Sequence, residues 1–226
     1  MSYFTIGSTG LVGSHFLSKA IESNGVNQIF TLTRKEIPTE NDKLIKIVSK
    51  DTNEWYNIIK ESKDVPIGST FFSSFGTTRK IAGSGENFVK IDHGINYLSF
   101  KSAKESGKYD TAIIVSSRGS NKDSFLLYLK TKGKLEQDII DLKFKRTIIL
   151  KPGILLGKRE TPKDFNNTSG EIIGSFFRGT FIGNLIGYPV YAEEVAKAAL
   201  KLSLEPIKSD GEVITVSSEE LIELAK

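Results

Sequence analysis

A glycine loop directly after the first apolar run is the feature that most constrains what this chain can fold into. Phe4–Ile6 reads as a short strand, Gly7, Gly10 and Gly13 follow at a three-residue spacing, and a helical pattern begins at once. Glycine permits a tight turn and lets a diphosphate approach main-chain N–H groups without a Cβ in the way. The positive end of the following helix points to the same place, so the loop predicts an anion site.

Strand patterns and helix patterns then alternate to the end of the chain. The further β-rich runs are Gln28–Thr33, Leu44–Val48, Ser69–Phe75, Thr111–Val115, Thr147–Leu150 and Val213–Val216. Between them lie helical patterns, of which the longest, Asn87–Ser106, is expected to end at Gly107. This alternation predicts an α/β fold, a Rossmann-like doubly wound parallel sheet with helices on both faces. We expect residues 1–226 to form a single NAD(P)-binding domain, with a very small C-terminal substrate lobe or lid at about 157–191.

Composition excludes several classes of site. The chain of 226 residues has no cysteine and two histidines, which rules out disulfides, cysteine-bound zinc and thiol nucleophiles, and we expect no metal site. The net charge of +4 comes from scattered lysines, which favours a small anionic ligand over nucleic acid. No apolar run approaches the roughly 20 residues of a membrane span. We also expect no cleaved leader, because cleavage past Ile6 would remove the first strand and the glycine loop.

Unusual residues follow the end of almost every predicted strand. They are Gly7–Gly13, Arg34, Lys35, Asp51, Gly76, Thr77, Ser116, Ser117, Pro152 and Gly153. In a parallel sheet the carboxyl ends of all strands lie at one edge, which is where such sheets bind dinucleotides. The sequence therefore predicts one site built from these loops.

The second strand indicates which cofactor binds. A site for NAD places an acidic residue about 20 residues past the glycines to bind the ribose 2′-hydroxyl. Here Thr33, Arg34 and Lys35 occupy that place. A guanidinium binds a 2′-phosphate in bidentate fashion, so we predict NADP(H) in preference to NAD(H). The alternative is that Arg34 and Lys35 are simply solvated basic residues at a strand end.

Tyr128 and Lys132 are four residues apart on a predicted helix and so share a face. A nearby ammonium stabilises a phenolate, which makes the tyrosine a proton donor for a carbonyl that accepts a hydride. Ser117 lies at the end of the preceding strand and is expected to bind the same carbonyl oxygen. The alternative is that Tyr128 packs against its neighbours and Lys132 is solvated.

These motifs resemble a known superfamily. Gly7-x-x-Gly10-x-x-Gly13, Ser117, Tyr128-x-x-x-Lys132 and Pro152-Gly153 are similar to the short-chain dehydrogenases/reductases, in their atypical, extended-like branch. Further stretches resemble the fungal Found-in-Mitochondrial-Proteome protein 52 family, which is similar to the Tat-interacting oxidoreductase-like proteins. They are Gly76–Arg79, Val89–Asp92, Tyr128–Gly133, Lys151–Gly157 and Gly187–Tyr191.

The resemblance implies a role for each matching position. The diphosphate would lie along Gly7, Ser8, Thr9, Gly10, Leu11, Val12 and Gly13, and the adenosine end between Arg34, Lys35 and Asp51. Gly76, Thr77 and Thr78 would line the cofactor, Lys132 would bind the nicotinamide ribose, and Pro152 and Gly153 would lie beside the nicotinamide. Ser117, Tyr128 and Lys132 would be catalytic. Two positions depart from the pattern: Lys151 replaces a frequent arginine, and Arg118 replaces a small residue.

The resulting hypothesis is an NADP(H)-dependent reductase of a small carbonyl compound. The alternative is a catalytically silent NADP(H)-binding regulator or scaffold. The family resemblance also implies peripheral attachment to the cytosolic side of the mitochondrial outer membrane. The apolar segment 172–186 is compatible with a lid, with a membrane-contacting patch or with plain packing. The sequence does not indicate an oligomeric state.

Overall fold

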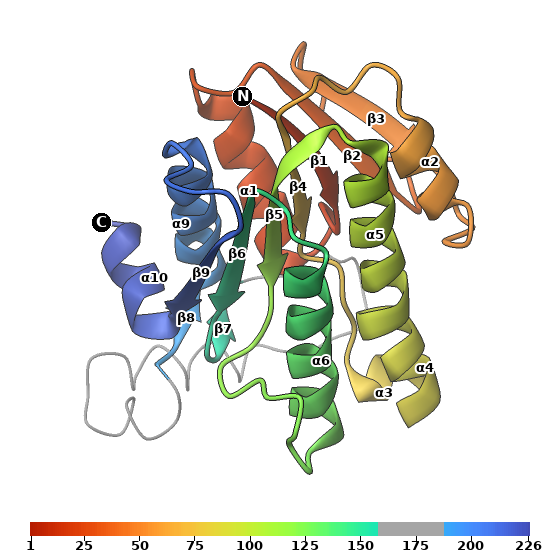
Figure 1. The fold of residues 1–226 in the computed structure, drawn as a ribbon, viewed down its shortest axis with the longest axis vertical. Helices are drawn as coiled ribbons and strands as arrows, with labels where there is room; N and C mark the ends of the chain where they lie inside the picture. The colour runs from red at the N-terminus through yellow and green to blue at the C-terminus, as the bar shows by residue number, and fades with distance from the viewer. Residues whose placement is uncertain (158–187) are drawn as a thin grey trace.

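Parallel strands and crossover helices alternate along the chain, as the sequence predicts. The computed structural model describes residues 1–157 and 188–226, and Figure 1 shows their arrangement. The strands of the main sheet are β1 (Ser2–Ile6), β2 (Gln28–Thr33), β3 (Leu44–Val48), β4 (Ser69–Ser73), β5 (Tyr109–Val115), β6 (Arg146–Lys151) and β9 (Glu212–Ser217). The helices are α1 (Leu11–Glu22), α2 (Trp55–Glu61), α3 (Arg79–Ala82), α4 (Gly85–Val89), α5 (Asn96–Ser106), α6 (Leu127–Asp141), α9 (Ala192–Leu204) and α10 (Ser218–Leu224).

The sheet has the order β3-β2-β1-β4-β5-β6-β9, and every neighbouring pair is parallel. From β1 the chain builds outward through β2 to β3, then returns to pair β4 on the other side of β1. Ile6, at the end of β1, therefore lies between Leu32 and Ser73. The switch point between β1 and β4 is where doubly wound sheets open a crevice for a ligand. The predicted doubly wound fold is confirmed.

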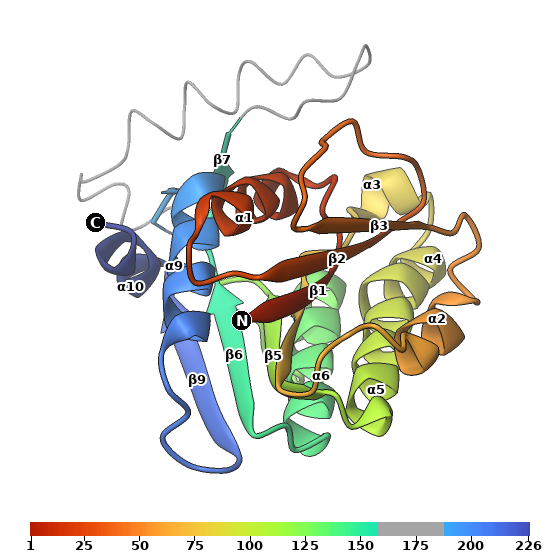
Figure 2. The ribbon, with the colours of Figure 1, turned by 90° about the horizontal axis from the view of Figure 1, so that it is seen from above.

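Helices cover both faces of the sheet. In Figure 2, α1 and α9 lie side by side on one face, and α2, α5 and α6 lie on the other. Side chains that alternate along β1 feed two cores: Tyr3 packs with Phe16 and Phe72, whereas Phe4 packs with Phe71 on the opposite face. Both faces of a parallel sheet are buried in this way, which explains the nearly continuous apolar runs of its strands.

The long helix predicted over 87–106 is interrupted. It begins at Gly85 as α4, continues as a π-helical turn, η1 (Lys90–Ile95), and ends as α5 at Gly107, which has a left-handed φ of 70°. The Asn96 main-chain N–H donates to the His93 carbonyl oxygen. The Asp92 carbonyl oxygen accepts from the Asn96 side-chain amide instead. A polar side chain thus takes over a main-chain hydrogen bond, which periodicity alone does not reveal.

Three short elements appear where the sequence indicates loops. Arg79 begins α3, because Thr78 Oγ1 accepts a hydrogen bond from the Ile81 N–H at 3.2 Å. The strands β7 (Leu155–Leu156) and β8 (Val190–Tyr191) pair in parallel. Only the two ends of the expected lobe at 157–191 belong to the described residues, and the segment 172–186 lies outside them.

Within residues 1–157 and 188–226, no helix combines the length and the apolarity that a membrane crossing requires.

Candidate cofactor and active site

The three glycines of the first loop serve three different purposes. Gly7 has a φ of +86°, and a Cβ there would lie 2.5 Å from the Phe75 nitrogen. A Cβ on Gly13 would lie 2.1 Å from the Gly7 carbonyl oxygen, so this glycine lets α1 pack closely on the loop. Gly10 is the N-cap of α1 and no side chain caps the helix, which leaves its first N–H groups open to an anion. The loop therefore fits a diphosphate.

The other residues of the glycine loop differ in their burial. The hydroxyls of Ser8 and Thr5 lie 2.8 Å apart and are both buried, while Val12 belongs to the core that α1 shares with α9. Thr9 is exposed at the surface of the loop. Leu11 lies so close to Gly157 that a Cβ on that glycine would come within 3.0 Å of it.

Arg34 and Lys35 are exposed at the carboxyl end of β2. The Arg34 guanidinium carbon lies 5.7 Å from the centroid of the Phe75 ring, which follows β4. The nearby carboxylate of Glu36 lies 3.8 Å from Lys46 Nζ, so its charge is partly offset. Asp51 has a local partner, because its Oδ1 accepts hydrogen bonds from the N–H and the side-chain amide of Asn53. That turn precedes α2.

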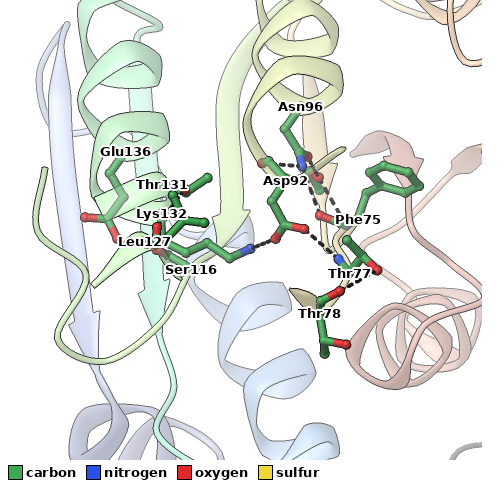
Figure 3. Close-up of polar contacts among 11 residues, drawn as sticks. Phe75, Thr77, Thr78, Asp92, Asn96, Ser116, Leu127, Thr131, Lys132 and Glu136 are labelled. Atoms are coloured by element: carbon green, nitrogen blue, oxygen red, sulfur yellow. Dashed lines mark hydrogen bonds and ion pairs between the residues drawn. The ribbon is translucent and has the colours of Figure 1, made fainter. Parts of the chain in front are cut away.

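An ion pair links three elements at the carboxyl edge of the sheet. Lys132 Nζ, from α6, lies 2.7 Å from Asp92 Oδ1 of η1, and the two side chains are 7% and 0% exposed. Asp92 Oδ2 accepts a hydrogen bond from the Thr77 N–H at 2.7 Å, in the loop after β4 (Figure 3). A Cβ on Gly76 would come within 3.0 Å of Asp92 Oδ1, so the glycine leaves space for the pair.

Tyr128 lies one turn before Lys132 on α6 and is 43% exposed. Its ring centroid is 5.8 Å from that of Phe88. Both rings line a cavity of about 440 Å³, whose other walls are Arg79, Leu126, Leu127 and Leu129. The phenol is thus accessible from solvent and borders a cavity, whereas the neighbouring lysine is buried in its ion pair.

The two adjacent serines after β5 have different environments. Ser116 is buried and donates to the Glu136 carboxylate, which also accepts from Ser120 and lies 3.1 Å from Lys151 Nζ. Ser117 is partly exposed and donates only a long hydrogen bond, of 3.3 Å, to the Arg118 carbonyl oxygen. Ser116 therefore holds the loop in place, and the Ser117 hydroxyl remains available to a ligand.

The loop after β6 is tied to the C-terminal helix. The Pro152 carbonyl oxygen accepts from the Arg118 N–H at 2.8 Å, and the Gly153 N–H donates to Ser218 Oγ at 2.9 Å. The Arg118 guanidinium lies 2.9 Å from the Glu219 carboxylate and 5.0 Å from the centroid of the Tyr188 ring. Arg118 is thus engaged with α10 and the segment before β8.

Sequence reasoning assigned no role to Asp92, Asn96 or Glu136. Asp92 and Asn96 follow Phe88 at intervals of four residues, so a helical projection places them on a buried face. Glu136 follows Lys132 at the same interval on α6. Charged or amide side chains repeated on the buried face of a helix are the signal that identifies these positions, because such groups are buried only with partners.

No protein-family model matches the chain. Solved structures share its fold, and two of them show how similar the folds are. One is the Bordetella bronchiseptica enzyme WbmF in complex with NAD+, with a TM-score of 0.69, 12% identity and coverage of 99% of this chain and 76% of that one. The other is UDP-glucose 4-epimerase from Thermotoga maritima, with a TM-score of 0.66, 16% identity and coverage of 100% and 82%. Fold and glycine loop thus define the chain as a Rossmann-like α/β protein.

Sequence relatives are closer. "Protein FMP52, mitochondrial" of Debaryomyces hansenii is 48% identical, with coverage of 100% of this chain and 99% of the relative. The proteins of that name from Meyerozyma guilliermondii and Candida albicans are 44% and 42% identical over 100% of this chain and 96% and 98% of theirs. The chain belongs to the FMP52 family.

Proposed function

We propose that this protein binds NADP(H) and reduces a small carbonyl compound, with Tyr128 as the proton donor. The observation that carries the proposal is the arrangement on α6, where an accessible tyrosine lies one turn before a lysine that a buried aspartate holds in place. Lys132 contacts Asp92, and Asp92 accepts a hydrogen bond from the Thr77 N–H. These contacts connect α6 to the loop after β4, beside the β1–β4 switch point. Support for a nicotinamide dinucleotide comes from similar folds solved with NAD.

The glycine loop would hold the diphosphate at the open start of α1, and Arg34 with Lys35 would bind the 2′-phosphate. Asp51 would approach the adenosine end. The loop after β4 (Gly76, Thr77 and Thr78), Lys132, Pro152 and Gly153 would line the nicotinamide half. When bound, the nicotinamide supplies the hydride that reduces the carbonyl carbon.

The chain's own residues then supply the proton and the orientation. The Ser117 hydroxyl donates a hydrogen bond to the carbonyl oxygen and turns it toward Tyr128. As the carbon gains the hydride, the oxygen gains the phenolic proton and an alcohol forms. The Lys132 ammonium stabilises the phenolate that remains. Asp92 fixes the position of that ammonium, and solvent at the exposed phenol returns the proton.

A panel of aldehydes and ketones tests the proposal directly, with NADPH oxidation followed for each compound. Turnover of at least one carbonyl compound supports the reductase. Tight NADPH binding together with no turnover across the panel contradicts it and supports a silent cofactor-binding regulator or scaffold.

Arg34→Ala is expected to weaken NADPH binding by about 10-fold to 100-fold, because a charge-assisted bidentate contact with the 2′-phosphate contributes about 1.5–3 kcal/mol. NADH lacks that phosphate, so its Kd is expected to change little. Titration of the wild type and of Arg34→Ala with NADPH and with NADH measures the ratio of the two Kd values. The control is Lys50→Ala, which removes an exposed positive charge after β3. Equal affinities of the wild type for NADPH and NADH would remove the NADP assignment.

The location proposed for this protein is the mitochondrion, peripherally on the cytosolic side of the outer membrane. The names of the relatives support the organelle. We expect the protein in the mitochondrial fraction, released by alkaline carbonate and digested by protease added to intact mitochondria. Resistance to protease until the outer membrane is ruptured would contradict the cytosolic side. Substitution of Phe176 and Phe177 by serine tests whether the segment 172–186 contributes to attachment.

A further inference from the structure

The cavity beside Tyr128 has an apolar wall and a single charge. Phe88, Leu126, Leu127 and Leu129 supply the wall, and Arg79 supplies the charge. Phe88 is fully buried and gives the wall a fixed base, whereas Leu126 is 65% exposed at the rim. Burial of this surface by a ligand is favourable, since each buried methylene contributes about 0.8 kcal/mol. A ligand that fills the cavity therefore needs an apolar body.

Arg79 is the charged member of the lining; it is exposed to solvent, and its side chain has no ion pair or hydrogen bond among the described residues. By contrast, Arg118, which follows Ser117 in the chain, binds Glu219, and Lys132 binds Asp92. A guanidinium next to apolar side chains pairs with a carboxylate through two parallel hydrogen bonds. Arg79 is thus available to an anionic group of a ligand in this cavity.

We infer that the substrate is an apolar oxo acid, with its hydrocarbon body against Phe88 and the three leucines and its anionic group on Arg79. This inference rests on the proposed reductase for the role of Tyr128, which borders the same cavity. The substrate presents its carbonyl to Tyr128 and its carboxylate to Arg79, since both residues line one cavity of about 440 Å³. Binding itself depends only on the cavity and on Arg79.

The test uses two non-reacting probes that differ in one group, the carboxylate hydrocinnamate and its neutral amide hydrocinnamamide, titrated calorimetrically into the protein with and without NADP+. We expect the carboxylate to bind about tenfold more tightly or better, as a charge-assisted pair predicts. Arg79→Gln removes that preference. Lys130→Gln, which removes an exposed charge from α6 outside the lining, preserves it. Leu126→Ala weakens both probes by a similar factor, because it removes part of the apolar wall.

Turnover separates this inference from the proposed function. Phenylpyruvate carries a carboxylate and phenylacetone does not, and we expect a higher kcat/KM for the oxo acid, lost in Arg79→Gln. Selective binding of hydrocinnamate without turnover of any carbonyl compound overturns the reductase and keeps the pocket assignment. Turnover without a preference for the acid overturns the pocket assignment and keeps the reductase. If Arg79→Gln weakens NADPH binding and leaves the ratio of the two probe affinities unchanged, the pocket assignment is also overturned. Arg79 would then bind the cofactor.

Discussion

Tyr128→Phe is expected to lower kcat for carbonyl reduction by a factor of roughly 10²–10⁴, the contribution of a positioned general acid. The substitution removes one oxygen atom and keeps the ring that packs 5.8 Å from Phe88. The Kd for NADPH and the melting temperature are therefore expected to stay close to wild type. Stopped-flow or steady-state NADPH oxidation with the best substrate of the carbonyl panel measures the effect.

Tyr97→Phe is the matched control, since Tyr97 loses the same atom on α5, where its ring lies beside His93. Its kcat is expected to equal that of the wild type. A Tyr128→Phe variant that keeps full activity would show that another group delivers the proton, and would leave Ser117 as the first alternative.

Asp92→Ala is expected to destabilise the protein by about 3–5 kcal/mol, because it leaves the Lys132 ammonium buried without its counter-ion. The Thr77 N–H also loses its acceptor. For a domain of this size, roughly 2–4 °C of melting temperature is lost per kcal/mol, so a fall of about 10 °C is expected. Thermal unfolding followed by circular dichroism measures it.

A surface pair provides the control for Asp92. Asp110 lies 3.0 Å from Lys145 Nζ, but the two side chains are 27% and 53% exposed, so Asp110→Ala is expected to cost less than about 1 kcal/mol. Combining Asp92→Ala with Lys132→Met removes both buried charges and is expected to recover much of the lost stability. Equal costs for the Asp92 and Asp110 variants would contradict the importance of the buried pair.

Local patterns were sufficient to predict most of the sheet. The bounds of β2 and β3 match the predicted runs Gln28–Thr33 and Leu44–Val48. Each of these elements owes its bounds to a local run of apolar residues and to the turn residues beside it. The helix α10 likewise begins at a local signal, a capping box of Ser217 with Glu220.

Long-range polar contacts could not be predicted in this way. The shared helical face of Tyr128 and Lys132 follows from their spacing, but the spacing does not indicate that Lys132 binds Asp92. Nor does it indicate that Arg118 turns to Glu219, near the other end of the chain. Such pairs depend on which elements the fold brings together. The catalytic and cofactor roles of the site residues stay predictions.

The loops that carry Ser117, Pro152 and Gly153 are both held by α10. The Gly153–Ser218 hydrogen bond and the Arg118–Glu219 ion pair join these loops to α10, and the bond from the Arg118 N–H to Pro152 joins the loops to each other. The helix α10 therefore supports the side of the site for which the nicotinamide is proposed. Shortening the chain before Ser218 would remove this support and also Leu221, which is fully buried in the core that contains Tyr3. Glu219→Gln, by contrast, would weaken only the contact with Arg118 and loosen the position of the Ser117 hydroxyl. Loss of activity in the Glu219 variant would then report on the alignment of these loops rather than on folding.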